Sequence, residues 1–161
     1  MNCLLKNKKQ LLLFISFLFQ ITLIQAQEQS FVAVDGKLEF TMVSGKEEHL
    51  TLSFLVKEGF HIQANQVKDE NLIPTALYLS GPDQLLIGEP VYPAAAEFHM
   101  RGAEESLLVF GDELKITIPI QINEPAKKTY FLNGKLHYQA CDDRKCFFPR
   151  DLPFVIKINV E

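Results

Sequence analysis

The sequence has no tryptophan, and only four residues separate the two cysteines in the body of the chain. Antibody-type immunoglobulin domains carry a buried tryptophan packed against a disulfide between distant strands, so that specific signature is excluded. After residue 26 there is also no apolar run close to the 20 or so residues that a membrane-spanning helix needs. No stable membrane insertion is therefore expected for this part.

Basic residues are in deficit once the N-terminal segment is set aside. Residues 27–161 hold 13 Lys and Arg against 20 Asp and Glu, a formal charge of −7. Nucleic-acid-binding proteins need a basic patch or stripe, and none is present, so nucleic acid is excluded as a partner.

The first 26 residues follow the pattern of a secretory signal peptide. Three lysines precede an apolar run over residues 11–19, and a small residue, Ala26, precedes Gln27. The alternative, an uncleaved membrane anchor, is disfavoured because the run is too short to span a bilayer with margin. We expect a periplasmic or secreted protein cleaved near Ala26/Gln27, with residues 27–161 forming one domain and Cys3 lost with the signal.

The dominant pattern after the signal is strict alternation of apolar and polar residues, which is typical of strands with one buried face. The apolar members are Leu50, Leu52, Phe54, Val56, Ile116, Ile118, Ile120, Ile122, Phe154, Ile156, Ile158 and Val160. Further strands are predicted within residues 37–43, 60–66, 75–80, 106–110 and 135–140.

Turn residues separate these strands, including Asn133-Gly134, and no window of 12 or more residues has a helical stripe. About eight short strands of this kind predict an all-β fold, a β-sandwich. Residues 89–105 lack a clear period and are predicted to form a long loop of the type that often carries function.

Cys141 and Cys146 remain after signal removal, in a compartment where disulfides persist. One interpretation is a structural disulfide, although a ring this small contributes only about 2 kcal/mol in the loop-entropy model. The other is disulfide exchange with partner proteins, which needs a sulfur that a partner thiolate can reach. If Leu136 and Tyr138 face inward, Cys141 lies on the opposite, wetter face. The spacing of the two cysteines alone favours neither the structural disulfide nor disulfide exchange.

A metal site is a third possibility, with His137 joining the two cysteines. A Cys-x4-Cys pair plus one histidine matches no common zinc pattern. We therefore expect no metal and no cofactor.

The segment Tyr138-Gln-Ala-Cys141, a short polar loop and Cys146-Phe-Phe-Pro149 resembles the N-terminal periplasmic domain of the thiol:disulfide interchange protein DsbD. The likeness is specific around the cysteines and diffuse over the rest of residues 50–160. It implies an immunoglobulin-like β-sandwich and a thiol:disulfide interchange activity, of the protein-disulfide reductase type, that depends on partner proteins. Cys141 and Cys146 match the redox pair, with Cys146 as the sulfur that forms the mixed disulfide.

The resemblance also implies surroundings for the pair. Glu97 and Phe98 are the best local match to the cap loop that shields the family's cysteines. His61 and Gln63 stand where the family carries tyrosines near the active site, and His61 is expected near the sulfurs.

The implied partners are thioredoxin-fold redox proteins and a membrane thiol reductase, which would act in trans because the chain ends at Glu161. A different class remains as the alternative: a non-catalytic binding or adhesion sandwich whose local disulfide fixes a loop.

Overall fold

The computed structural model describes residues 30–123 and 127–161, and the predicted signal peptide lies outside them. These residues form twelve strands, and within them no helix is long and apolar enough to cross a membrane. The all-β prediction is confirmed.

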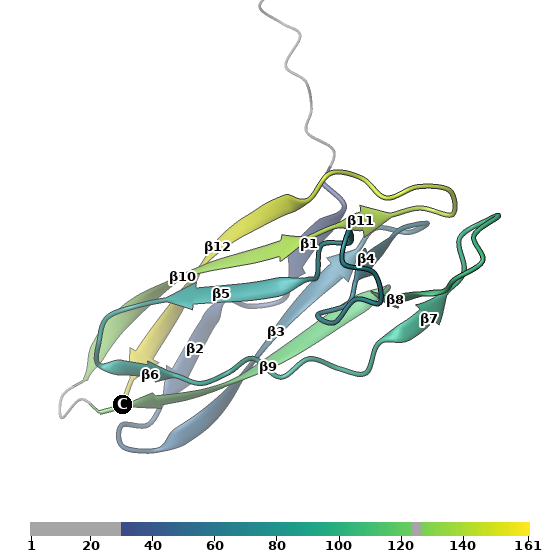
Figure 1. Ribbon diagram of the computed structural model, residues 1–161. Coiled ribbons are helices and arrows are strands. Elements are labelled where there is room, and N and C mark those ends of the chain that lie inside the picture. Colours follow the sequence, from purple (N-terminus) through teal and green to yellow (C-terminus); the bar gives the residue numbers. More distant parts are fainter. Residues whose placement is uncertain (1–29, 124–126) are drawn as a thin grey trace, which may run out of the picture. The chain divides into compact units, whose positions relative to one another are not determined.

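Two four-stranded sheets face each other (Figure 1). The first has the order β1 (Val32–Asp35), β3 (Glu47–Val56), β9 (Glu113–Ile122) and β6 (Leu85–Ile87). The second has the order β2 (Glu39–Met42), β12 (Arg150–Val160), β10 (Lys128–Tyr138) and β5 (Ala76–Ser80). Apart from the parallel pair of β2 and β12, neighbouring strands in these two sheets run antiparallel.

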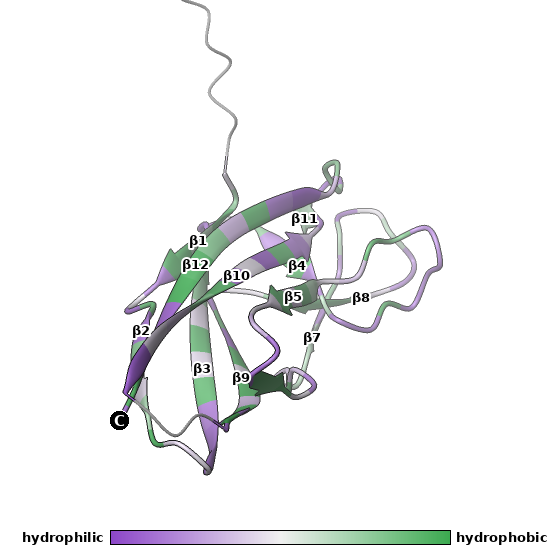
Figure 2. Ribbon diagram, turned by 90° about the vertical axis from the view of Figure 1, so that its left-hand side faces the viewer, coloured by the Kyte–Doolittle hydropathy of each residue, from purple (hydrophilic) through white to green (hydrophobic). Residues whose placement is uncertain are grey.

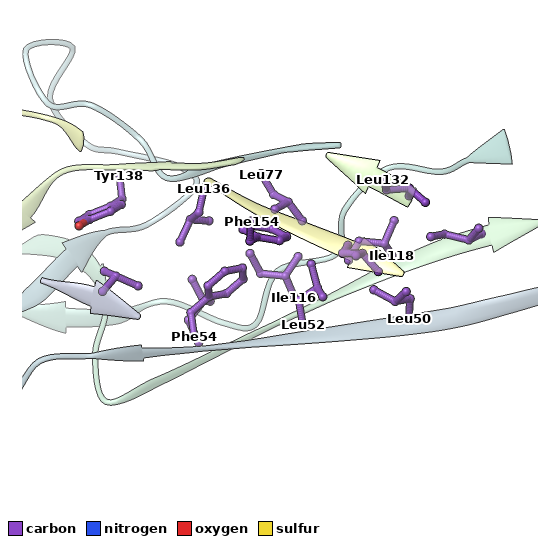
Figure 3. Close-up of a cluster of buried hydrophobic side chains, with 14 of the residues drawn as sticks. Leu50, Leu52, Phe54, Leu77, Ile116, Ile118, Leu132, Leu136, Tyr138 and Phe154 are labelled. Carbon is purple, nitrogen blue, oxygen red and sulfur yellow. The ribbon is translucent and has the colours of Figure 1, made fainter. Parts of the chain in front are cut away.

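The core lies between the two sheets. Side chains of β3 and β9 meet those of β5, β10 and β12, as Figure 3 shows for Phe54, Ile116, Leu77, Leu136 and Phe154. All the apolar positions that alternation assigned to the inner face are buried. The same alternation is visible as bands of hydropathy along β3 and β12 (Figure 2). The domain is an immunoglobulin-like β-sandwich, as expected.

A third, small sheet lies at one end of the sandwich, on the right in Figure 1. Its order is β11 (Ala140–Cys141), β4 (His61–Gln63), β8 (Leu107–Phe110) and β7 (Ala96–Phe98). Strands far apart in sequence thus bring Cys141, His61 and Phe98 to one small sheet.

Two sequence predictions were wrong. Residues 89–105 are not simply a loop, because they contain β7 and because Val91 forms a bridge with Thr117. Asn133-Gly134 is not a turn but lies inside β10, where Gly134 is paired with Phe154 of β12. Strands β1, β6 and β7 were not predicted from the sequence.

Candidate functional site

The two cysteines close a small ring at the end of the sandwich. Cys141 and Cys146 form an antiparallel bridge and a disulfide with an Sγ–Sγ distance of 2.04 Å. The Asp142 carboxylate accepts the backbone N–H groups of Arg144 and Lys145, both at 2.8 Å. These bonds stabilise the charged carboxylate and hold the pKa of Asp142 below its usual value. The ring is therefore shaped by its own local hydrogen bonds.

The two sulfurs differ in accessibility. Cys141 is completely buried, whereas Cys146 is partly exposed. The prediction that Cys141 lies on a wetter face was wrong, because Gln139 belongs to no strand and separates β10 of the second sheet from β11 of the third. The alternation of burial continues through half-buried Gln139 and buried Ala140 and breaks at Cys141, which is buried in β11 of the third sheet. Of the two cysteines, only Cys146 has exposed surface.

Gln63 contacts the disulfide directly. Its side-chain amide Nε2 donates to Cys141 Sγ at 3.1 Å and lies 3.6 Å from Cys146 Sγ. Gln63 is itself completely buried, and its Oε1 has no hydrogen-bond partner among the described residues. In the sequence, Gln63 was noted only because it stands where the family carries a tyrosine. Its place on the same strand face as His61 was the signal that could have identified it.

His61 lies beside Cys141 in the third sheet. It is the direct cross-strand neighbour of Cys141, so the two side chains share one face of the third sheet. The His61 ring stacks on Phe98, with 4.0 Å between ring centroids and 29° between planes. Its Nδ1 is buried without a hydrogen-bond partner in the described part of the chain.

Glu97 and Phe98 lie on β7, and the structure brings only Phe98 close to the cysteine side of the sheet. Glu97 is exposed and pairs with Lys68 at 2.8 Å, a contact that lowers the pKa of Glu97. The segment after β7 then reaches the cysteine ring, because Arg101 forms an ion pair with Asp143 at 2.9 Å and donates its backbone N–H to the Asp143 carbonyl at 2.7 Å. β7 thus contacts His61 beside the ring, and the segment after β7 contacts the ring itself at Asp143.

The two aromatic residues after Cys146 point in different directions. Phe147 is anchored in the protein, with its ring 4.8 Å from that of Phe31 and 5.8 Å from that of Phe60. Phe148 is 91% exposed. An aromatic ring this exposed, two residues from the accessible sulfur, is suited to contact with another protein. No pattern in the sequence marked Phe148 as exposed.

His137 would be the third ligand of a metal site at the cysteine pair. His137 lies on β10 and its Nδ1 pairs with Asp151 at 2.6 Å. Across residues 30–123 and 127–161, no group of three or more His, Cys, Asp and Glu side chains could share a metal ion.

A family model described as the N-terminal part of the thiol:disulfide interchange protein DsbD matches residues 28–155. Among curated proteins, none matches the chain.

Three solved structures are similar to this chain at low sequence identity. The N-terminal periplasmic domain of ScsB from Proteus mirabilis is 12% identical with a TM-score of 0.51, and the match covers 78% of this chain but only 44% of that one. The reduced N-terminal domain of DsbD from Neisseria meningitidis is 20% identical with a TM-score of 0.43, covering 68% of this chain and 76% of that one. The major subunit of aggregative adherence fimbriae type I from Escherichia coli is 12% identical with a TM-score of 0.40, covering 81% of this chain and 94% of that one.

Proposed function

Since the chain belongs to the family of N-terminal domains of the thiol:disulfide interchange protein DsbD, we propose that its Cys141–Cys146 pair passes electrons between partner proteins by thiol–disulfide exchange. The proposed partners are thioredoxin-fold redox proteins, with a membrane thiol reductase as the source of electrons. The activity resides in the two sulfurs and needs no cofactor.

The observation that carries this proposal is the asymmetry of the disulfide. Cys146 is partly exposed and stands two residues from the exposed ring of Phe148, whereas Cys141 is buried behind it. Exchange needs one sulfur that a partner can attack and a second that leaves or returns within the protein. The asymmetry supports Cys146 as the attacked sulfur and Cys141 as the resolving one.

In the reducing direction, a partner thiolate attacks Cys146 Sγ and forms a mixed disulfide. The Cys141–Cys146 bond breaks, and its electron pair leaves on Cys141 Sγ, which takes up a proton. The partner's second thiolate then attacks the partner sulfur of the mixed disulfide and releases Cys146 as a thiolate, which is protonated in turn. Two electrons have moved to this domain, and the partner dithiol has become a disulfide. Electron delivery to an acceptor is the reverse sequence.

Trapping with single-cysteine variants tests the proposal. Cys141→Ser should accumulate covalent complexes between Cys146 and thioredoxin-fold proteins, seen on non-reducing gels, because no second thiol is present to release them. Cys146→Ser should trap few or none. Both variants should stay folded, because the ring contributes about 2 kcal/mol against a domain stability of about 5–15 kcal/mol.

Other outcomes contradict the proposal in separate ways. Stronger trapping by Cys146→Ser would reverse the two roles. Two folded variants that trap nothing, together with a wild-type potential well below about −300 mV, would favour the alternative of a binding module with a structural disulfide. Unfolding of both variants would also favour a structural disulfide.

We further propose that residues 1–26 are a signal peptide and that residues 27–161 work in the periplasm. The support is the lysine-rich start followed by the apolar run. Mass spectrometry of the protein from its native source should find an N-terminus at or near Gln27. Recovery of the chain with its first 26 residues attached would contradict the cleavage.

A further inference from the structure

Gln63 is the one side chain outside the cysteine ring for which the described part of the chain shows a polar contact to both sulfurs. The contact distances are 3.1 Å to Cys141 Sγ and 3.6 Å to Cys146 Sγ, so the amide lies nearer the buried sulfur. The backbone holds it there, because Gln63 N–H donates to the Gln139 carbonyl at 2.9 Å and the Thr75 hydroxyl donates to the Gln63 carbonyl. The amide therefore faces the disulfide from a fixed strand.

When the disulfide is intact, only one of the two polar groups of the Gln63 amide has a hydrogen-bond partner. A disulfide sulfur carries no hydrogen, so it can accept from the amide NH2 group but cannot donate to the amide oxygen. Accordingly Nε2 faces the sulfurs, and the buried Oε1 has no partner among the described residues. A buried polar atom without a partner is costly compared with the same atom hydrogen-bonded.

Reduction of the pair changes what the amide can bind. When Cys141 is released as a thiolate, its charge makes it a stronger acceptor for the Nε2–H group already 3.1 Å away. Rotation of the amide would let its oxygen accept from a protonated Cys141 S–H, but it would then leave Nε2 where Oε1 now has no partner. The gain on reduction therefore lies in the thiolate form, to which the amide donates more strongly than to the disulfide.

We propose that Gln63 shifts the redox equilibrium of the Cys141–Cys146 pair toward the reduced form, because its amide donates more strongly to the released Cys141 thiolate than to the disulfide. The inference rests on the proposed exchange function and assigns a redox-tuning residue to the same site. The electrons and protons are those that the partner dithiol supplies in the exchange, and Gln63 gains or loses neither.

A second glutamine offers a matched control. Gln139 also borders the cysteine ring, but its amide is paired on both sides, accepting from Ile73 N–H at 2.9 Å and donating to the Phe147 carbonyl at 3.1 Å. Replacing Gln139 loosens the attachment of the ring without removing the group that faces the sulfurs.

The test equilibrates wild type, Gln63→Met and Gln139→Met in glutathione buffers and measures the oxidised fraction by thiol alkylation and mass spectrometry. Gln63→Met should lower the equilibrium constant for reduction roughly tenfold, or about 30 mV for this two-electron couple. Gln139→Met should shift it much less. An unchanged or more reducible Gln63→Met would overturn the proposal. So would an equal shift in Gln139→Met, because attachment of the ring would then be the cause.

A measurement on the wild-type protein decides the matter if Gln63→Met does not fold. The side-chain amide resonances of Gln63 should move strongly between oxidised and reduced protein, while those of Gln139 stay nearly constant. Unmoved Gln63 resonances would overturn the proposal. The exchange function is tested by a different experiment. If the cysteine variants trap no partners, the exchange function is contradicted regardless of the Gln63 result. If Gln63→Met has no effect but partners are trapped, only the role of Gln63 is contradicted.

Discussion

Gly134 lets β10 and β12 lie close together inside the sandwich. It is paired with Phe154, and a Cβ atom added at Gly134 would stand 2.2 Å from Phe154 Cε2 and 2.5 Å from Cζ. The Phe154 ring thus occupies the space of the missing side chain. A glycine inside a strand often marks such a close approach. The same Asn133-Gly134 pair is also common in turns, and for that reason the sequence predicted a turn here.

Gly134→Ala should therefore destabilise the domain by about 1–3 kcal/mol, the usual cost of overpacking, measured as a lower urea midpoint with an unchanged slope. Asn133→Ala, at the exposed neighbouring position of the same strand, is the control and should change little. Phe154→Leu should restore part of the loss in the Gly134→Ala background. Equal midpoints for Gly134→Ala and wild type would contradict the close packing.

At the scale of elements, β7 and the segment that follows it cover one side of the cysteine region. Phe98 stacks on His61, the cross-strand neighbour of Cys141, and Arg101 pairs with Asp143 inside the ring. The exposed ion pairs of this segment stabilise little by themselves, because solvent screens them. The stacked ring is therefore the contact expected to matter most for access to the pair.

Phe98→Ala should increase the rate at which dithiothreitol reduces the Cys141–Cys146 disulfide several-fold, because it uncovers His61 beside Cys141. The rate is measured by quenching with an alkylating reagent at successive times. Glu97→Gln is the control, since it weakens the Lys68 ion pair but keeps the Phe98 ring. A reduction rate that Phe98→Ala leaves unchanged would show that β7 does not shield the pair.

At the scale of the whole molecule, several exposed carboxylates favour the folded state at neutral pH. Hydrogen bonds to the charged form are the largest cause that lowers the pKa in each case. The groups are Glu39, Asp69, Glu97, Asp142 and Asp151. A carboxylate whose folded pKa is lowered contributes its full stability above its ordinary pKa, and loses it as the pH falls through the lowered value.

The urea midpoint should therefore stay nearly constant from pH 7 to about pH 5. It should fall below the ordinary pKa values of 4.5 for Glu39 and 3.8 for Asp142. In Glu39→Gln, which cannot titrate at this position, the fall between pH 5 and pH 3 should be smaller than in wild type. A midpoint at pH 3 equal to that at pH 7 would contradict the prediction.

The sequence by itself determined which strands hold the core and where the cysteine pair lies. Side-chain alternation follows from the geometry of an extended backbone, so residues such as Leu52, Ile118 and Ile156 could be assigned to the interior without knowledge of the fold. All three are buried. The cysteine motif is equally local, because Cys141 and Cys146 lie within one short loop.

Only the tertiary structure decided how that motif is presented. Cys141 is buried where β11 pairs with β4 in the third sheet, and the contact of Gln63 with Cys141 joins residues 78 positions apart. The fit of Gly134 against Phe154 likewise depends on the register of two paired strands. Such contacts depend on which strands pair and in which register, and the local pattern of one strand does not encode its partner.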